Sequence, residues 1–183
     1  YNIEYVEEKE RGYDFLEDIF VPGYFELPLR KGESVIFTAG LNETDTSKLK
    51  QIYSSETKKR IPRNNYKNCL INSGLQFFVT RNNKVDIIAG YPWFGRWGRD
   101  TFIALPGLTL AINEPEKCKA IMDHMIADLK GGLLPNVGCG ADSSYNSVDA
   151  PLWFFWTLQQ YAIYTGTQAT IWQEYGDKMK LIL

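Results

Sequence analysis

Two segments of this chain are almost wholly apolar and long enough to form helices, and they restrict its possible folds more than any other feature. They have the sequences "TFIALPGLTLAI" (residues 101–112) and "APLWFFWTL" (residues 150–158). A helix that is apolar on every side must be buried on every side in a water-soluble protein. The helix expected between them has a single apolar stripe, made of Cys118, Ile121, Met122, Met125 and Leu129. Helices of these two kinds alternate where an outer layer of helices surrounds an inner one.

The one-sided helix between the apolar segments has recognisable start signals. Asn113 and Glu116 have the spacing of a capping box, and Pro115 suits the first turn of a helix. His124 lies off the apolar stripe of this helix, so we expect it at the surface.

Two further helices are predicted at the ends of this region. Residues 66–80 form an amphipathic stretch that leads to the extended piece "KVDIIAG". The last helix has one apolar face, formed by Ile171, Trp172, Tyr175, Met179 and Ile182. It reaches Leu183 without a glycine cap or a polar stop, and the chain starts at Tyr1. We therefore expect the chain to be a piece of a longer protein.

The first 62 residues have a different pattern. Residues 1–40 contain the short strand-like runs "YNIEYVEE" and "SVIFTAG", separated by turn-forming sequence, so we expect the edge of a β-rich domain. Residues 41–62 are polar and partly helical in pattern, which is typical of a connector, and Lys58, Lys59 and Arg60 are expected on a solvated face. The helical domain then occupies residues 63–183.

Composition and missing motifs exclude several functions. The 20 basic and 22 acidic residues give a net charge of −2, and no basic stripe indicates a nucleic-acid partner. The longest apolar run is too short to span a membrane, and no signal peptide is visible, so we expect a cytoplasmic protein. Three scattered cysteines and one histidine do not predict a metal site or a disulfide framework. No phosphate-binding or dinucleotide motif is present, and we expect no cofactor.

The stretch "GYPWFGRWGRDTF" (residues 90–102) is the first candidate site. Trp93 and Trp97 offer flat faces on which the apolar faces of sugar rings can stack, and Arg99 and Asp100 offer donors and acceptors for hydroxyl groups. In the alternative interpretation, Asp100 is only favoured by the dipole at a helix start, and the tryptophans fill a core.

The stretch "YNSVDAPLWFFW" (residues 145–156) repeats this design. Asn146, Ser147 and Asp149 precede the second apolar helix. If both apolar helices belong to one inner layer, their polar starts lie at the same end and form one pocket. The alternative is that Ser147 or Asp149 only caps the helix.

These two stretches, together with "GGLLPNVG" and "ERGYDFLEDIFVPGYFE", resemble the C-terminal glucosidase region of glycogen debranching enzymes. The resemblance covers about residues 8–165, with four motifs in the family's order. It implies a mainly α chain that forms the first helices of an (α/α)6 toroid, with residues 1–40 left from a preceding β-sandwich domain. It also implies an amylo-α-1,6-glucosidase that acts with inversion on α-glucans such as glycogen, limit dextrin and maltooligosaccharides.

The resemblance also implies roles for single residues. Arg99 and Asp100 would bind the glucose hydroxyls, Trp93 and Trp97 would form the walls, and Asn146 and Asp149 would line the same mouth. The general acid and base are expected beyond Leu183, so this chain alone should be inactive. Two alternatives remain open: a non-catalytic α-glucan-binding protein, and a toroid glycosidase that acts on a different α-glycoside.

Overall fold

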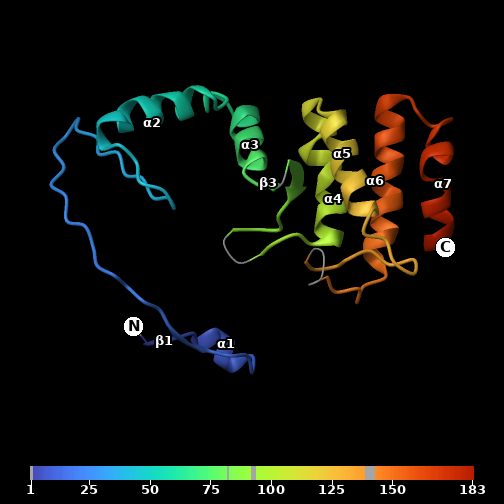
Figure 1. The fold of residues 1–183 in the computed structure, drawn as a ribbon, viewed down its shortest axis with the longest axis horizontal. Coiled ribbons are helices and arrows are strands. Elements are labelled where there is room, and N and C mark those ends of the chain that lie inside the picture. Colours follow the sequence, from blue (N-terminus) through green and yellow to red (C-terminus); the bar gives the residue numbers. More distant parts are fainter. Residues whose placement is uncertain (1, 82, 92–93, 139–142) are drawn as a thin grey trace. The chain divides into compact units, whose positions relative to one another are not determined.

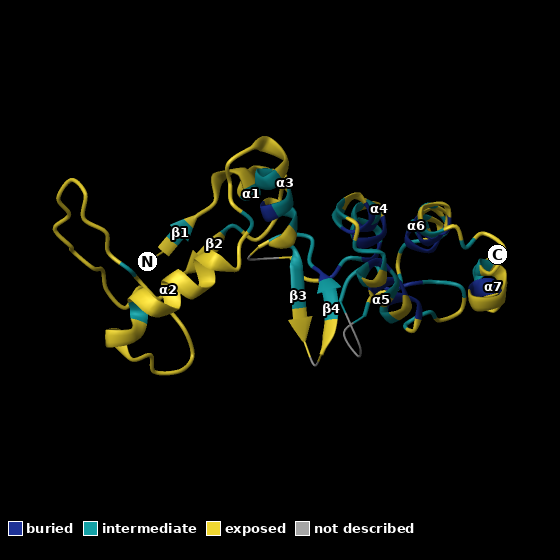
Figure 2. Cartoon of the chain, turned by 90° about the horizontal axis from the view of Figure 1, so that it is seen from above, coloured by how far each residue is buried: buried dark blue, intermediate teal, exposed yellow. Residues whose placement is uncertain are grey.

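The computed structural model describes residues 2–81, 83–91, 94–138 and 143–183, and the chain divides into two compact units, Tyr1–Glu56 and Thr57–Leu183. Helices predominate, as the sequence predicts (Figure 1). Figure 2 shows that exposed residues make up most of the first unit, whereas the buried residues gather on the later helices of the second.

The first unit contains one small β-sheet. Strand β1 (Asn2–Glu4) pairs antiparallel with β2 (Leu16–Asp18), and α1 (Val6–Glu10) lies between them in the sequence. The 3₁₀ helix η1 (Thr46–Lys48) is capped by the Asp45 side chain and is followed by α2 (Leu49–Lys58). Helical structure therefore occurs in the segment that was expected to be a partly helical connector.

The predicted strand at "SVIFTAG" does not form, and residues 19–45 contain neither helix nor strand. Apolar side chains along this segment are exposed, including Phe20 at 86% and Tyr24 at 87%. A strand is stabilised by pairing with a neighbour and by packing of an apolar face, and the apolar side chains along this segment are largely exposed.

The second unit begins with α3 (Tyr66–Leu75), which is shorter than the predicted helix at residues 66–80. The remaining residues form β3 (Phe78–Arg81), which pairs antiparallel with β4 (Lys84–Ile87). The aromatic and β-branched residues after Leu75 favour a strand once a partner is available, and tertiary pairing overrides the helical pattern.

Four longer helices form the rest of the unit. They are α4 (Gly98–Leu108), α5 (Pro115–Ile126), α6 (Asp149–Thr165) and α7 (Ile171–Ile182), with the 3₁₀ helix η2 (Leu110–Ile112) between α4 and α5. Helices α4 and α6 run parallel in one layer, and α5 and α7 run the opposite way in a second layer (Figures 1 and 2). The two helices with nearly all-apolar sequence thus share a layer.

The core lies between the two layers. The rings of Phe102 on α4 and Phe154 on α6 meet edge to face at a centroid distance of 5.6 Å. The Thr157 hydroxyl donates to the Phe102 carbonyl at 2.6 Å. Each large apolar side chain buried here contributes about 1.5–3 kcal/mol. The fully buried apolar side chains include Phe102, Leu105, Cys118, Ile121, Met122, Met125, Leu134 and Phe154.

The prediction that α4 and α6 are buried on every side is only partly correct. Their second apolar face is open in this chain, with Leu152 exposed at 57% and Ile163 at 58%. The faces toward α5 and α7, and the sides by which α4 and α6 contact each other, are covered. Apolar composition determines that a helix can be buried, but a second packing layer is needed to bury it.

Two local predictions for α5 were wrong. Asn113 does not cap this helix, because it adopts the left-handed conformation after η2 (φ 64°) and its side chain accepts a hydrogen bond from Tyr164 at 2.7 Å. His124 is not a surface residue, because its ring is largely buried and Nδ1 lies 2.9 Å from the Asp86 carboxylate. Pro115 does occupy the first turn, as predicted.

Candidate functional site

The turn before α4 is held in place by backbone hydrogen bonds. The Ala89 amide donates to the Gly95 carbonyl at 2.9 Å, and the Phe94 amide donates to the Gly90 carbonyl at 3.0 Å. Trp97 forms an antiparallel bridge with Val137. The start of α4 is therefore attached to the loop that leads to α6.

Gly98 allows three segments to meet at this point. Its amide donates to the Asn136 carbonyl at 2.9 Å. A Cβ atom at this position would lie 2.2 Å from the Pro135 carbonyl oxygen and 3.4 Å from the Ala150 Cβ on α6. Glycine is thus required by the close approach of α4 to its neighbours.

Arg99 joins the starts of the two parallel helices. Its Nη1 atom lies 3.2 Å from Oδ2 of Asp149, the first residue of α6, and its Nε atom lies 3.7 Å from Oδ1 of Asp100. The Ser147 hydroxyl donates to the other oxygen of Asp149. We call Arg99, Asp100 and Asp149 the clamp. The two helix starts therefore lie at the same end of their layer.

The ionisation of the clamp follows from these contacts. The hydrogen bond from Ser147 and the charge of Arg99 lower the pKa of Asp149 below its ordinary value of 3.8. The hydrogen bond and charge of Asp149 raise the pKa of Arg99. At neutral pH the clamp therefore contains a charged guanidinium and an ionised Asp149, both partly accessible to solvent.

The other predicted site residues have different positions. Trp97 is half-buried, and its ring meets Phe94 edge to face at 6.2 Å. Asn146 is exposed in the loop before α6. Trp93 lies outside the described residues. The capping alternative for the second stretch is not observed, because the N-cap of α6 is Val148 and it makes no side-chain cap bond.

The clamp offers hydrogen-bonding groups of both kinds. A guanidinium donates to hydroxyl oxygens and two carboxylates accept from hydroxyl hydrogens, so the arrangement suits a ring with several hydroxyl groups. A general acid needs a raised pKa, whereas the pKa of Asp149 is lowered. The lowered pKa of Asp149 therefore does not favour a role as proton donor.

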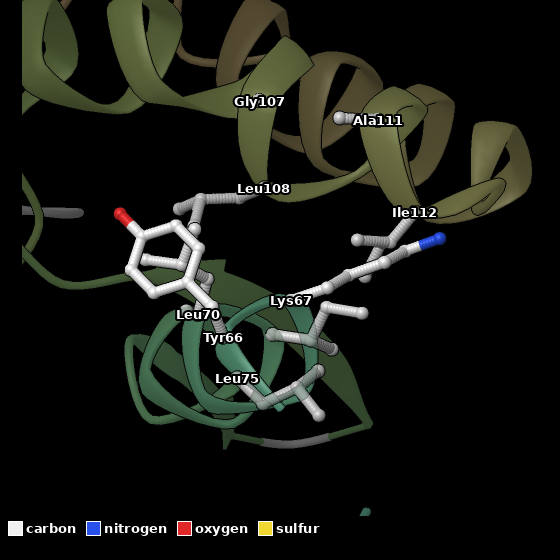
Figure 3. Close-up of a pocket in the computed structure, with 10 residues that line it drawn as sticks. Tyr66, Lys67, Leu70, Leu75, Gly107, Leu108, Ala111 and Ile112 are labelled. Carbon is white, nitrogen blue, oxygen red and sulfur yellow. The ribbon is translucent and has the colours of Figure 1, made fainter. Parts of the chain in front are cut away.

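An apolar cavity of about 280 Å³ lies elsewhere, between α3 and the end of α4 with η2. Figure 3 shows Leu70 and Leu75 on one side and Leu108 and Ile112 on the other. Tyr66 and Lys67 are the polar side chains on its wall. This cavity lacks the set of donors and acceptors that a hydroxyl-rich ligand needs, so the clamp remains the candidate site.

Ser147 belongs to the second candidate stretch but was not expected to bind the ligand, and Arg96 was not expected in the site. The hydrogen bond from Ser147 to Asp149 is a local one, because a hydroxyl two residues from a carboxylate can bond to it. Arg96 is buried against acidic side chains far away in the sequence, and no local pattern distinguishes it from Arg99.

Two negative observations complete the description. Among the described residues, no three His, Cys, Asp or Glu side chains gather in a way that could hold a metal ion. Within the same residues, each helix is too short or too polar to cross a membrane.

The comparisons with known proteins agree on one family. Residues 72–183 match the model described as amylo-α-1,6-glucosidase, and residues 1–36 match the model described as glycogen debranching enzyme N terminal. A glycogen debranching enzyme of Saccharomyces cerevisiae is 34% identical over 98 residues, which is 50% of this chain and 6% of that protein. The chain thus corresponds to a small part of this relative. No solved structure matches the chain. Three of the four motifs lie within residues 72–183, whereas "ERGYDFLEDIFVPGYFE" lies within the match to the N-terminal model and not in the glucosidase region where it was expected. Because the first model covers more than half of the chain, the chain belongs to the amylo-α-1,6-glucosidase family of glycogen debranching enzymes.

Proposed function

We propose that the clamp binds the glucose unit that a debranching α-1,6-glucosidase removes from glycogen or limit dextrin. The observation that carries this proposal is the pairing of Arg99 with Asp149, which joins the two helix starts in a chain of this family. Asp149 holds the guanidinium, and Asp100 has only the longer 3.7 Å contact with it. Asp100 can therefore accept hydrogen bonds from sugar hydroxyls while Arg99 donates to them. In this proposal Trp93, Trp97 and Asn146 also border the bound glucose ring.

The helices are proposed to be the first part of an (α/α)6 toroid. Support comes from their two layers, with α4 and α6 parallel in one and α5 and α7 antiparallel to them in the other. The open apolar faces of α4 and α6 would be covered by the further inner helices of such a ring. Residues 1–40 are proposed to be the edge of a β-sandwich, which is consistent with the paired strands β1 and β2 and with the match of residues 1–36. The connector is then residues 41–62, and the boundary between the compact units falls inside it.

The proposed reaction is hydrolysis with inversion and without a cofactor. Inversion requires a general acid and a general base about 6.5–9.5 Å apart on opposite sides of the bond. In this proposal the clamp supplies recognition, and the acid and base come from sequence beyond Leu183. We therefore expect that the 183-residue chain alone releases no glucose.

The test uses the complete gene product and a limit dextrin, with glucose release as the measurement. Asp100→Asn removes a charged acceptor, and a hydrogen bond to a charged group contributes about 1.5–3 kcal/mol, so kcat/KM should fall about 10- to 100-fold. Asp177→Asn is the matched control, because Asp177 is fully exposed on α7. If Asp100→Asn and Asp177→Asn have the same kcat/KM, the role of the clamp is wrong.

One observation favours a second function, a non-catalytic α-glucan-binding protein. The clamp by itself supplies binding groups, which such a protein would need equally. Binding of maltooligosaccharides by the complete gene product without glucose release from limit dextrin would favour this function. Release of glucose from another α-glycoside, and not from limit dextrin, would instead favour a toroid glycosidase with a different substrate.

A further inference from the structure

Arg96 is a buried cation three residues before the clamp, with 5% of its side chain exposed. Its Nη2 atom lies 2.6 Å from the Asp128 carboxylate, and its Nη1 atom lies 3.7 Å from the Asp86 carboxylate. Its Nε and Nη2 atoms also lie 3.4 Å from the Gly138 carbonyl oxygen. One guanidinium thus contacts three acceptors from different parts of the chain.

The three acceptors belong to separate elements. Asp86 is in β4, Asp128 follows the end of α5, and Gly138 is in the loop that leads to α6. The planar guanidinium can contact several acceptors in fixed directions, which a lysine ammonium cannot do in the same way. Arg96 therefore holds the turn before α4 against β4, α5 and the α6 loop together.

The acceptors are themselves held in place. His124 Nδ1 lies 2.9 Å from the same Asp86 oxygen that faces Arg96. The Tyr145 hydroxyl donates to the Asp128 carbonyl at 2.8 Å. The network thus reaches from α5 to the loop that contains Ser147 and precedes Asp149.

The backbone between Arg96 and the clamp is held by hydrogen bonds to a neighbouring segment. The Gly138 amide donates to the Arg96 carbonyl at 3.1 Å, Trp97 bridges Val137, and the Gly98 amide donates to the Asn136 carbonyl. Three consecutive residues of the turn are thus bonded to the same short segment, residues 136–138. A displacement of Arg96 would therefore also displace Arg99.

We propose that Arg96 is a positioning residue for sugar binding, which sets the distance between Arg99 and Asp149 through its contacts with Asp128, Asp86 and Gly138. The role in sugar binding rests on the proposed function, whereas the anchoring of the turn does not. Buried ion pairs often contribute little net stability, because removing charges from water is costly. Fixing one arrangement of the turn is therefore a better account of this buried charge than stability alone.

The test compares two matched variants of the complete gene product, Asp128→Asn and Asp123→Asn. Both lie on or just after α5, and Asp123 bonds to Lys119 and Tyr175, away from the turn. Asp128→Asn weakens the anchor while keeping the size of the side chain. Misplacement of a binding group by about 1 Å can cost up to 100-fold, so we expect KM for limit dextrin to rise about tenfold in Asp128→Asn. KM should stay unchanged in Asp123→Asn, since simple destabilisation reduces the folded fraction and hence the apparent kcat.

Arg96→Lys is the second variant, and it should raise KM at least as much as Asp128→Asn because a lysine cannot reproduce the three contacts. Hydrogen exchange in peptides that contain Gly98 and Gly138 gives a readout that does not depend on glucan. Exchange should be faster in Asp128→Asn than in Asp123→Asn. Equal exchange in the two variants would overturn the anchor, and an unchanged KM in both Asp128→Asn and Arg96→Lys would overturn its role in binding. If the wild type releases no glucose, the proposed function fails, and the exchange comparison still decides the anchor.

Discussion

Replacing Gly98 with alanine should displace the start of α4. The new Cβ would lie 2.2 Å from the Pro135 carbonyl oxygen, and ordinary contact begins at 3.4 Å, so a separation of 3.4 − 2.2 = 1.2 Å is missing. Movement of the helix is further restricted because the same new Cβ would lie 3.4 Å from the Ala150 Cβ on α6. Pro135 is itself fully buried, so its carbonyl cannot turn toward solvent.

The free energy of unfolding should fall by about 1–3.5 kcal/mol. Forcing extra volume into a packed site typically costs about 1–3 kcal/mol. A shift of this size also breaks the 2.9 Å hydrogen bond from the Gly98 amide to Asn136, which contributes about 1 kcal/mol. Alanine is favoured over glycine in a helix by about 0.5–1 kcal/mol, which offsets part of this loss.

Urea unfolding of the chain, followed by tryptophan fluorescence, measures this effect. All five tryptophans lie in the second unit, so the signal reports on that unit. Gly107→Ala is the matched control in the same helix, since a Cβ there would meet nothing within 4 Å. It should stabilise the unit by about 0.5–1 kcal/mol. If Gly98→Ala is as stable as the wild type, or if both variants lose equal stability, the reasoning from close approach is refuted.

Three further predictions concern ionisation, packing and reactivity. The folded-state pKa of Asp149 is lowered, so its contribution to stability is complete above its unfolded value of 3.8 and is lost as the pH falls through the folded pKa. The difference in unfolding free energy between wild type and Asp149→Asn, measured from pH 7 to pH 2, should therefore be constant above about pH 5 and shrink below 3.8. Phe102→Ala should lower the unfolding free energy by about 3–5 kcal/mol in urea, because Phe102 is fully buried against Phe154. Burial raises the pKa of the Cys118 thiol to about 11, so mass spectrometry after iodoacetamide treatment at pH 8 should find Cys69 modified well before Cys118.

Each of these three predictions can be contradicted by one measurement. A stability difference for Asp149→Asn that persists unchanged to pH 2 would show that the ionised carboxylate is not the source. A loss below 1 kcal/mol for Phe102→Ala would mean that the packing between α4 and α6 is looser than described. Equal labelling of the two cysteines in the native protein would contradict the burial of Cys118.

Much of the helical architecture could be predicted, because helix formation depends on neighbouring residues. Pro115 begins α5 as expected, and Asp100 and Asp149 lie in the first turns of the two apolar helices. The strand β3 was missed, because Phe78 to Arg81 suit a helix or a strand and only their pairing with β4 decides between them. The membership in the debranching family was also evident from the motifs, since four specific stretches in order are unlike any chance pattern.

The sequence by itself indicated the longer helices α4, α5, α6 and α7 and the polar residues at the starts of α4 and α6, because residue type and spacing along the chain are local properties. Tertiary structure alone decided how the two arginines of "GRWGR" divide their roles. Arg96 is buried against Asp128, 32 residues away, and Arg99 pairs with Asp149, 50 residues away, more closely than with its neighbour Asp100. These partners are brought together by the packing of α4 against α5 and α6, and the spacing of residues within one helix carries no information about distances between helices.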